Sequence, residues 1–192
     1  MSRVMLIGDS ILMAYAPKVR SLLGDAAEII EIPENGGDSA NVLSRLPAWL
    51  AELGSAPPPR VWVNCGLHDI KRAYGSDVRQ VGLDEYTRNV RSVLESLRDT
   101  TGGRVVWATT TPVVYERHHA TKGFDRFDSD VLDYNAAAAD VAASLSLPTH
   151  HLYAVVAAAG VMTCVGEDGV HMTEQGNRVL ADAVAERLLT SI

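Results

Sequence analysis

The sequence has little cysteine, no basic cluster and no long apolar run. Its two cysteines, Cys65 and Cys164, do not imply a disulfide; a bond between them is one alternative and two buried thiols are the other. No cysteine–histidine cluster is present, so no metal site is expected. The formal net charge is -7 without a basic run, which argues against nucleic acid or an anionic membrane as a partner. No segment reaches the roughly 20 apolar residues of a membrane-spanning helix.

What is present is typical of an ordinary globular domain. Of the 192 residues, 47% are hydrophobic and 21% are charged, so we expect one α/β domain over residues 1–192. The first apolar run begins at Val4 and leads straight into Gly8-Asp9-Ser10, which does not fit a removable signal peptide. We therefore expect a cytoplasmic protein, although a chain trimmed of its leader would look the same. The oligomeric state stays open, with a homodimer as one alternative.

Short apolar segments alternate with helical patterns along the chain. The segments rich in Val and Ile predict strands at 3–8, 27–32, 60–65, 104–110 and 149–153. Helices are predicted at 16–23, 39–53, 84–100, 128–146 and 173–190. This alternation favours a three-layer α/β/α sandwich around a flavodoxin-like, five-stranded parallel sheet. In such sheets ligands bind beyond the carboxyl ends of the strands, where Ser10 and the segments 66–69 and 110–113 are expected.

Two short motifs at opposite ends of the chain carry reactive groups. Ser10 stands at the end of the first apolar strand, and Asp168-Gly169-Val170-His171 precedes the last helix. A serine hydroxyl becomes a nucleophile when a histidine takes its proton and a carboxylate orients that histidine. Ser10 alone could simply cap a helix, and Asp168 with His171 could be a surface loop. Together they favour nucleophilic catalysis.

The order of these motifs resembles the GDSL, or SGNH, hydrolases over nearly the whole chain. Besides Gly8-Asp9-Ser10 and Asp168-x-x-His171, three blocks follow the second, third and fourth predicted strands in the family's order. They are Asn35-Gly36-Gly37-Asp38-Ser39, Gly66-Leu67-His68-Asp69 and Thr109-Thr110-Thr111-Pro112. The resemblance implies a serine esterase with the SGNH hydrolase fold that needs no cofactor and acts on a small-molecule ester.

The resemblance also implies a role for each matching residue. Ser10 would be the nucleophile, His171 the general base and acid, and Asp168 the residue that orients His171. The oxyanion donors would be Ser10 N–H, Gly37 N–H and His68, with Gly36 as the competing backbone donor. His68 departs from the family, which has asparagine there; it would replace that donor, face the substrate or loop, or mark an inactive member. Asp69 would brace the surrounding loops.

Residues 114–128 form the least regular segment and follow a strand at the expected active-site end. It is either a solvated loop or a substrate-facing lid, in which Arg117, Phe124 and Arg126 would contact a polar alcohol. Asp9 is a further candidate beside the nucleophile, as a substrate contact or a local hydrogen-bonding residue. Lys71, Arg72 and Tyr74 would line the same rim.

Few bulky side chains are available to form an acyl tunnel, since phenylalanine occurs only at 124 and 127. A short acyl group, above all acetyl, on a small polar alcohol therefore fits best, and the resemblance to small bacterial acetylesterases that act on carbohydrates favours a carbohydrate. The alternatives are a thioesterase or lysophospholipase of the same family, and a non-catalytic binding protein with the same fold.

Overall fold

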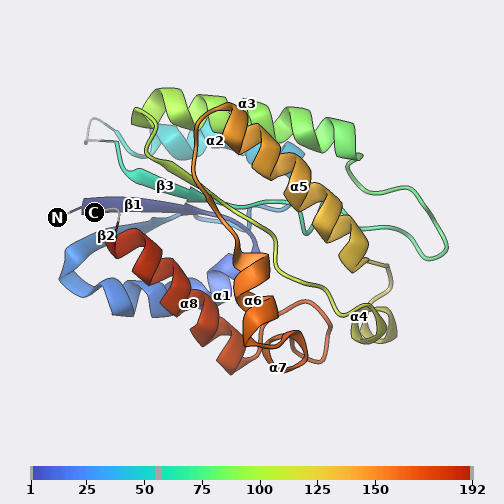
Figure 1. The fold of residues 1–192 in the computed structure, drawn as a ribbon. Helices are drawn as coiled ribbons and strands as arrows, with labels where there is room; N and C mark the ends of the chain where they lie inside the picture. Colours follow the sequence, from blue (N-terminus) through green and yellow to red (C-terminus); the bar gives the residue numbers. More distant parts are fainter. Residues whose placement is uncertain (1, 55–57, 191–192) are drawn as a thin grey trace.

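A five-stranded parallel sheet forms the centre of the molecule in the computed structural model, which describes residues 2–54 and 58–190 (Figure 1). The strands in chain order are β1 (Ser2–Ile7), β2 (Ala27–Glu31), β3 (Arg60–Val63), β4 (Val105–Ala108) and β5 (Thr149–His150). They lie side by side in the order β2-β1-β3-β4-β5. The chain thus runs from β1 out to β2 and returns to β3, so the predicted flavodoxin-like order is confirmed.

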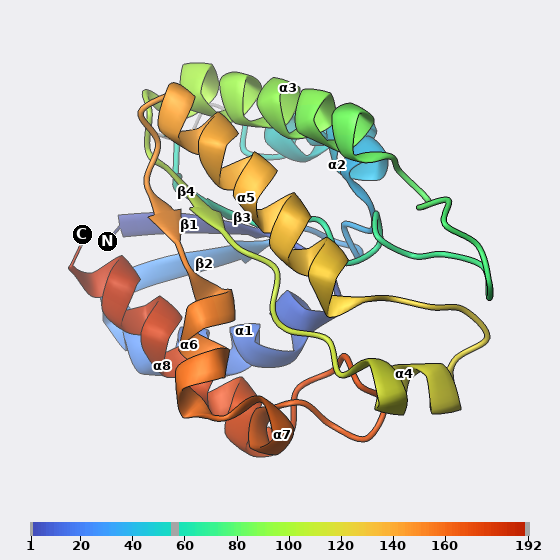
Figure 2. The ribbon, with the colours of Figure 1, turned by 45° about the vertical axis from the view of Figure 1, so that its right-hand side comes forward.

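Helices cover both faces of the sheet, which confirms the three-layer sandwich. Above the sheet in Figure 1 lie α2 (Ser39–Ala51), α3 (Leu83–Thr101) and α5 (Asp128–Ser144). Below it lie α1 (Ser10–Leu23), α6 (Leu152–Ala159) and α8 (Glu174–Leu189). The short α4 (Tyr115–Thr121) and α7 (Val161–Cys164) lie at the end of the molecule beyond the carboxyl ends of the strands (Figure 2), and a 3-10 turn, η1 (Gly24–Ala26), precedes β2.

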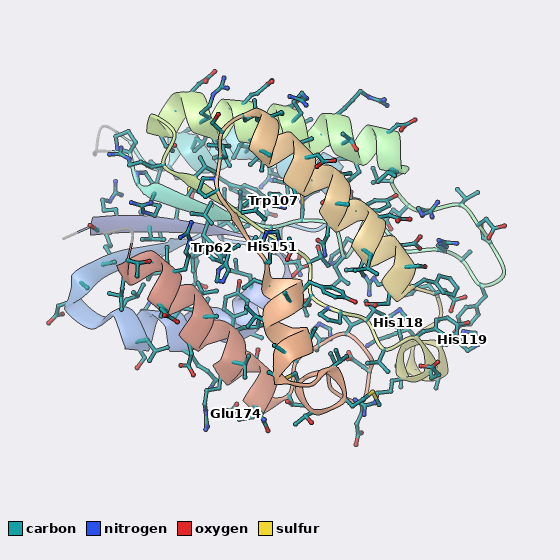
Figure 3. The ribbon with its side chains drawn as sticks, in the orientation of Figure 1. Trp62, Trp107, His118, His119, His151 and Glu174 are labelled. Atoms are coloured by element: carbon teal, nitrogen blue, oxygen red, sulfur yellow. The ribbon has the colours of Figure 1, made fainter. Side chains whose placement is uncertain are left out.

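The core is built as the periodicity predicts. The apolar face of α3 is fully buried, at 0% exposure for Tyr86, Val90, Val93, Leu94 and Leu97. All three tryptophans are core residues, and Figure 3 shows Trp62 and Trp107 beside the sheet. Both cysteines are free and buried, so the two-thiol alternative holds. No helix within the described residues is both long and apolar enough to cross a membrane.

Three elements differ from the sequence prediction, each for a local reason. Helix α1 begins at Ser10 rather than at 16, because Asp9 caps it and Pro17, usually a helix-start signal, lies in its interior on the exposed side. Strand β5 is only Thr149–His150, and the apolar residues after it belong to α6. The irregular segment 114–128 contains α4.

Candidate active site

Ser10 lies where β1 passes into α1, at the point where the strand order reverses. The Asp9 carboxylate accepts a hydrogen bond from Ile11 N–H at 2.9 Å and so begins the helix at Ser10. Gly8 precedes it because a Cβ there would come within 2.8 Å of the Leu12 side chain. The first N–H groups of a helix have no intrahelical partner, and none of the described residues bonds to Ser10 N–H. That N–H is free to bind a negative atom at the positive end of the helix dipole.

The loop before α8 brings His171 and Asp168 to Ser10. Ser10 Oγ lies 2.9 Å from His171 Nε2, and His171 Nδ1 lies 2.6 Å from Asp168 Oδ2. Since a carboxylate only accepts hydrogen bonds, Nδ1 donates to Asp168, and Nε2 is left to accept from the serine hydroxyl. The three residues that the sequence singled out, from both ends of the chain, therefore form one hydrogen-bonded chain.

Asp168 is held in the charged form that this chain needs. Partial burial alone would raise the pKa of Asp168, but hydrogen bonds from the His171 ring and from two backbone N–H groups lower it well below 3.8. Asp168 Oδ1 accepts those backbone bonds from Val170 at 3.1 Å and His171 at 2.9 Å. The carboxylate thus fixes the loop and orients the imidazole at the same time.

Helix α4 packs directly against this loop. Val114 N–H donates to Gly169 O at 2.8 Å, and the fully buried ring of His118 has its Nδ1 3.3 Å from Asp168 O. Gly169 has a φ of +75°, and a Cβ there would come within 2.4 Å of Val114 O and 2.5 Å of His118 N. The position between Asp168 and Val170 therefore requires glycine for both conformation and space.

Substituting Gly169 with alanine should destabilise the protein by ~2–5 kcal/mol, from backbone strain and overpacking together. Gly102, which ends α3, has a φ of +64°, and a Cβ added there would meet nothing within 4 Å, so Gly102→Ala carries the strain without the clash. We expect urea unfolding to show a cost of only ~1–2 kcal/mol for this control. Equal losses in the two variants would contradict the packing argument.

The backbone donors expected after β2 are both engaged. Gly36 N–H donates to Gly8 O at 2.9 Å, a bond between two buried backbone groups. Gly37 N–H donates to the side-chain oxygen of the exposed Asn35 at 2.9 Å. An exposed side chain is displaced more easily than a buried backbone carbonyl, so of the two glycines the geometry favours Gly37 as the oxyanion donor. No sequence pattern pointed to this contact of Asn35.

His68 lies in the turn that follows β3, and its ring has no hydrogen-bond partner among the described residues. Burial lowers the pKa of His68 below its usual 6.5, and the nearby positive charges of Arg126 and Lys71 act in the same direction, against Asp9 and Asp38. At neutral pH the ring is therefore uncharged and has one N–H to donate. Of a protonated and a neutral donor, the direction of this shift favours the neutral one.

If His68 donates to the oxyanion, His68→Ala should lower kcat/KM for 4-nitrophenyl acetate by roughly 10²–10³, the usual cost of one lost donor. His68→Asn should keep most of the rate, because its amide N–H can take the same place. Since the wild-type ring is neutral above pH 6.5, the two proteins should have parallel pH profiles from pH 7 upward. Equal rates for wild type and His68→Ala would exclude this role.

Asp69 braces the loops around the site, as the sequence predicts. Its carboxylate accepts from Ser39 N–H at 3.0 Å and from the Ser39 hydroxyl, which also accepts from Asn89 Nδ2 at 3.1 Å. Burial raises the pKa of Asp69 to about 6, although the bonds from Ser39 oppose the rise. The turn after β3 is thereby tied to the start of α2.

The structure corrects the position expected for Asp9. Asp9 is only 1% exposed, and its carboxylate caps α1 instead of facing a substrate. Of the two roles considered for it, local hydrogen bonding is the one that the geometry supports. The cap explains why an aspartate precedes the serine: it ends the strand and starts the helix.

The residues of 114–128 that the sequence suggested as substrate contacts lie in different environments. Arg117 donates to Val165 O at 2.5 Å and to Met162 O at 3.2 Å, so it ties α4 to α7 instead of facing an open site. Phe124 is half-buried, with its ring against His118, while Arg126 is only 6% exposed and donates to Leu67 O at 2.6 Å. The segment is thus not a solvated loop, and its role as a lid stays a prediction. His118 and His119 stand on α4 in Figure 3.

Two contacts of this segment escaped the sequence analysis. Lys122 Nζ lies 3.4 Å from Asp168 Oδ2, the same oxygen that His171 contacts. Tyr74 OH donates to His119 O at 2.9 Å and joins the loop after β3 to α4. Neither pairing has a sequence signal, because both join irregular segments far apart in the chain. No group of three or more His, Cys, Asp or Glu able to hold a metal ion occurs in residues 2–54 and 58–190.

Solved structures with the same fold are numerous. No protein-family model and no curated sequence matches the chain. It is similar to the lipase/acylhydrolase from Enterococcus faecalis, with 20% identity over 98% of this chain and 95% of that one and a TM-score of 0.76. It is also similar to a GDSL-like lipase from Bacteroides thetaiotaomicron, with 18% identity over 100% of this chain and 89% of that one and a TM-score of 0.71. The carbohydrate acetylesterase Est24 from Sinorhizobium meliloti is 15% identical over 100% of both chains, with a TM-score of 0.75. The chain therefore has the SGNH hydrolase fold.

Proposed function

We propose that this chain is a serine esterase of the GDSL, or SGNH, type, with Ser10 as nucleophile. The observation that carries the proposal is the hydrogen-bonded chain from Ser10 through His171 to Asp168, at 2.9 and 2.6 Å. Beside it, at the start of α1, lies the Ser10 N–H, which has no partner among the described residues. A nucleophile, its base and the residue that orients the base are what acyl transfer requires. The shared fold with lipases and acylhydrolases supports the same conclusion.

The reaction follows from these positions. His171 Nε2 takes the proton of Ser10 as Oγ attacks the ester carbonyl, and Asp168 stabilises the imidazolium that forms. Ser10 N–H, Gly37 N–H and the neutral His68 ring donate to the oxyanion. His171 then gives its proton to the alcohol as the C–O bond breaks and the acyl-enzyme remains. Water, deprotonated by His171, attacks the acyl carbon, the bond to Oγ breaks with return of the proton, and the acid leaves.

We expect the acyl part of the ester substrate to be short, above all acetyl. The support for a short chain is the scarcity of bulky side chains that could form an acyl tunnel, since phenylalanine occurs only at 124 and 127. A polar alcohol such as a carbohydrate is consistent with the named activity of Est24.

The test compares 4-nitrophenyl acetate, butyrate and octanoate, together with labelling by a fluorophosphonate probe. We expect the probe to label Ser10 and kcat/KM to fall as the acyl chain lengthens. A preference for octanoate would support a lysophospholipase or thioesterase instead. If the wild type neither reacts with the probe nor exceeds Ser10→Ala in turnover, the protein is a non-catalytic member of the fold.

A further inference from the structure

Arg126 is a buried cation that forms no ion pair with the described residues, although the negative charges of Asp9 and Asp168 act on it from a greater distance. The residue is 6% exposed, and its one protein hydrogen bond runs from Nε to Leu67 O. Among the described residues no carboxylate lies within 4 Å of the guanidinium, and its two terminal nitrogens have no hydrogen-bond partner although neither is fully enclosed. Burying a charge is costly unless it is paired, so these terminal nitrogens mark a place for an anion.

Lys71 is a second cation without a carboxylate partner in the described part of the chain, and it lies near the first. Its Nζ is 4.5 Å from the centre of the Phe124 ring, and Arg126 Cζ is 4.9 Å from the same centre. The aromatic ring attracts both cations but leaves their mutual repulsion in place. An anion bound near both cations would relieve that repulsion. By contrast, Arg72 and Arg79 nearby are both paired with the buried Asp130.

These two cations belong to the turn that carries His68. Arg126 is bonded to Leu67 O, and Lys71 N–H donates to His68 O at 3.3 Å. Lys71 and Phe124 also line an open groove of about 570 Å³, together with Gly123, Arg72, Arg79 and Gln80 among others, whereas Arg126 is not part of its lining. The groove owes its attraction for anions mainly to Lys71, because Arg72 and Arg79 in its wall are paired with Asp130. Its size suits the alcohol part of an ester whose acyl part is short.

We propose that Arg126 and Lys71 bind an anionic group on the alcohol part of the substrate, so that the preferred esters have an alcohol bearing a carboxylate. A guanidinium can hold a carboxylate by two parallel hydrogen bonds, and the Lys71 ammonium adds a point charge. Phe124 supplies the apolar surface between them. The proposal deepens the esterase activity proposed above and rests on it.

The test uses two acetyl esters of the same shape, 4-acetoxybenzoate and the neutral 4-acetoxybenzamide. Each kcat/KM is divided by the rate of hydrolysis by hydroxide, which removes the difference in leaving-group reactivity. We expect the wild type to prefer the anionic ester by roughly 10–100-fold, as a hydrogen-bonded charge pair provides. The preference should appear mainly in KM and should shrink at high salt.

Two variants and a control decide the assignment. Arg126→Met should bring the anionic preference close to 1, and Lys71→Met should lower it at least threefold. Arg91→Met removes a cation from the exposed face of α3, where Arg91 pairs with Glu95, and should leave the preference unchanged. If Arg126→Met fails to fold, Lys71→Met still tests the proposal, because Lys71 is half-exposed and its replacement should not disturb the core.

Failure of this proposal differs from failure of the esterase. A wild type that hydrolyses both esters equally, or a preference that Lys71→Met leaves intact, would overturn the anion subsite alone. Absence of any Ser10-dependent hydrolysis of either ester would overturn the proposed activity itself.

Discussion

Replacing His171 with alanine should lower kcat/KM for 4-nitrophenyl acetate by roughly 10⁴–10⁶, and replacing Ser10 with alanine should lower it by a similar factor. Ser10 Oγ has His171 Nε2 as its acceptor at 2.9 Å, and no second base contacts it in the described residues. Without that acceptor the hydroxyl keeps its proton and is a poor nucleophile. Without the hydroxyl the imidazole has nothing to activate.

The double variant Ser10→Ala/His171→Ala gives the sharper result. Residues that act as one unit are not additive, so the double variant should be no slower than either single variant by more than about threefold. Additive losses would mean that the two residues act in separate steps and would exclude the proposed chain. His151→Ala is the matched histidine control, since His151 is exposed after β5, and it should stay close to the wild-type rate.

All three proteins should remain folded, because neither side chain is part of the core. The His171 side chain is 48% exposed, and Ser10 is half-buried at the start of a helix that Asp9 caps. Circular dichroism and thermal melting check this point. A variant that loses activity together with its structure would say nothing about chemistry, which is why the melting curves belong to the same experiment.

The sheet could be predicted because its strands are buried on both faces. Residues 4–7 of β1 are apolar without interruption, and such runs are typical of parallel strands between two helix layers. Element ends were harder to predict. The first helix was predicted to begin at 16 although Asp9 caps it at Ser10, and the residues from Leu152 were predicted as strand although they fold as α6. Local patterns do not show which cap is used.

Of the candidate site, too, one part could be predicted from the sequence and another could not. Ser10, Asp168 and His171 could be found because their chemistry needs those residue types and because strand ends meet at one edge of the sheet. Lys122 beside Asp168, Asn35 on Gly37 N–H and the solitary guanidinium of Arg126 could not. They depend on how irregular segments pack, and nothing periodic records that packing. The sequence suggested that Arg126 binds substrate, but only the structure shows a buried guanidinium that forms no ion pair within the described residues.

Asp168→Asn should lower kcat by about 10⁴ while leaving the fold intact. The Asp168 carboxylate can only accept, so it keeps the proton on His171 Nδ1 and leaves Nε2 unprotonated for Ser10. An asparagine amide can donate to Nδ1, which moves the ring proton to Nε2 and removes the base. Asp182→Asn on the exposed side of α8 is the control and should retain full activity. A loss below tenfold in Asp168→Asn would mean that Asp168 does not set the tautomer.

The same substitution should also change the dependence of stability on pH. The pKa of Asp168 is lower in the folded protein than its usual 3.8, so the folded state binds fewer protons than the unfolded chain in acid. Its contribution to stability is therefore present above pH 4 and declines as the pH falls further. Asp168→Asn lacks this contribution at every pH. The difference in melting temperature between wild type and Asp168→Asn should thus be largest near pH 7 and shrink below pH 4. A difference that stays constant into acid would show that the Asp168 charge does not stabilise the loop.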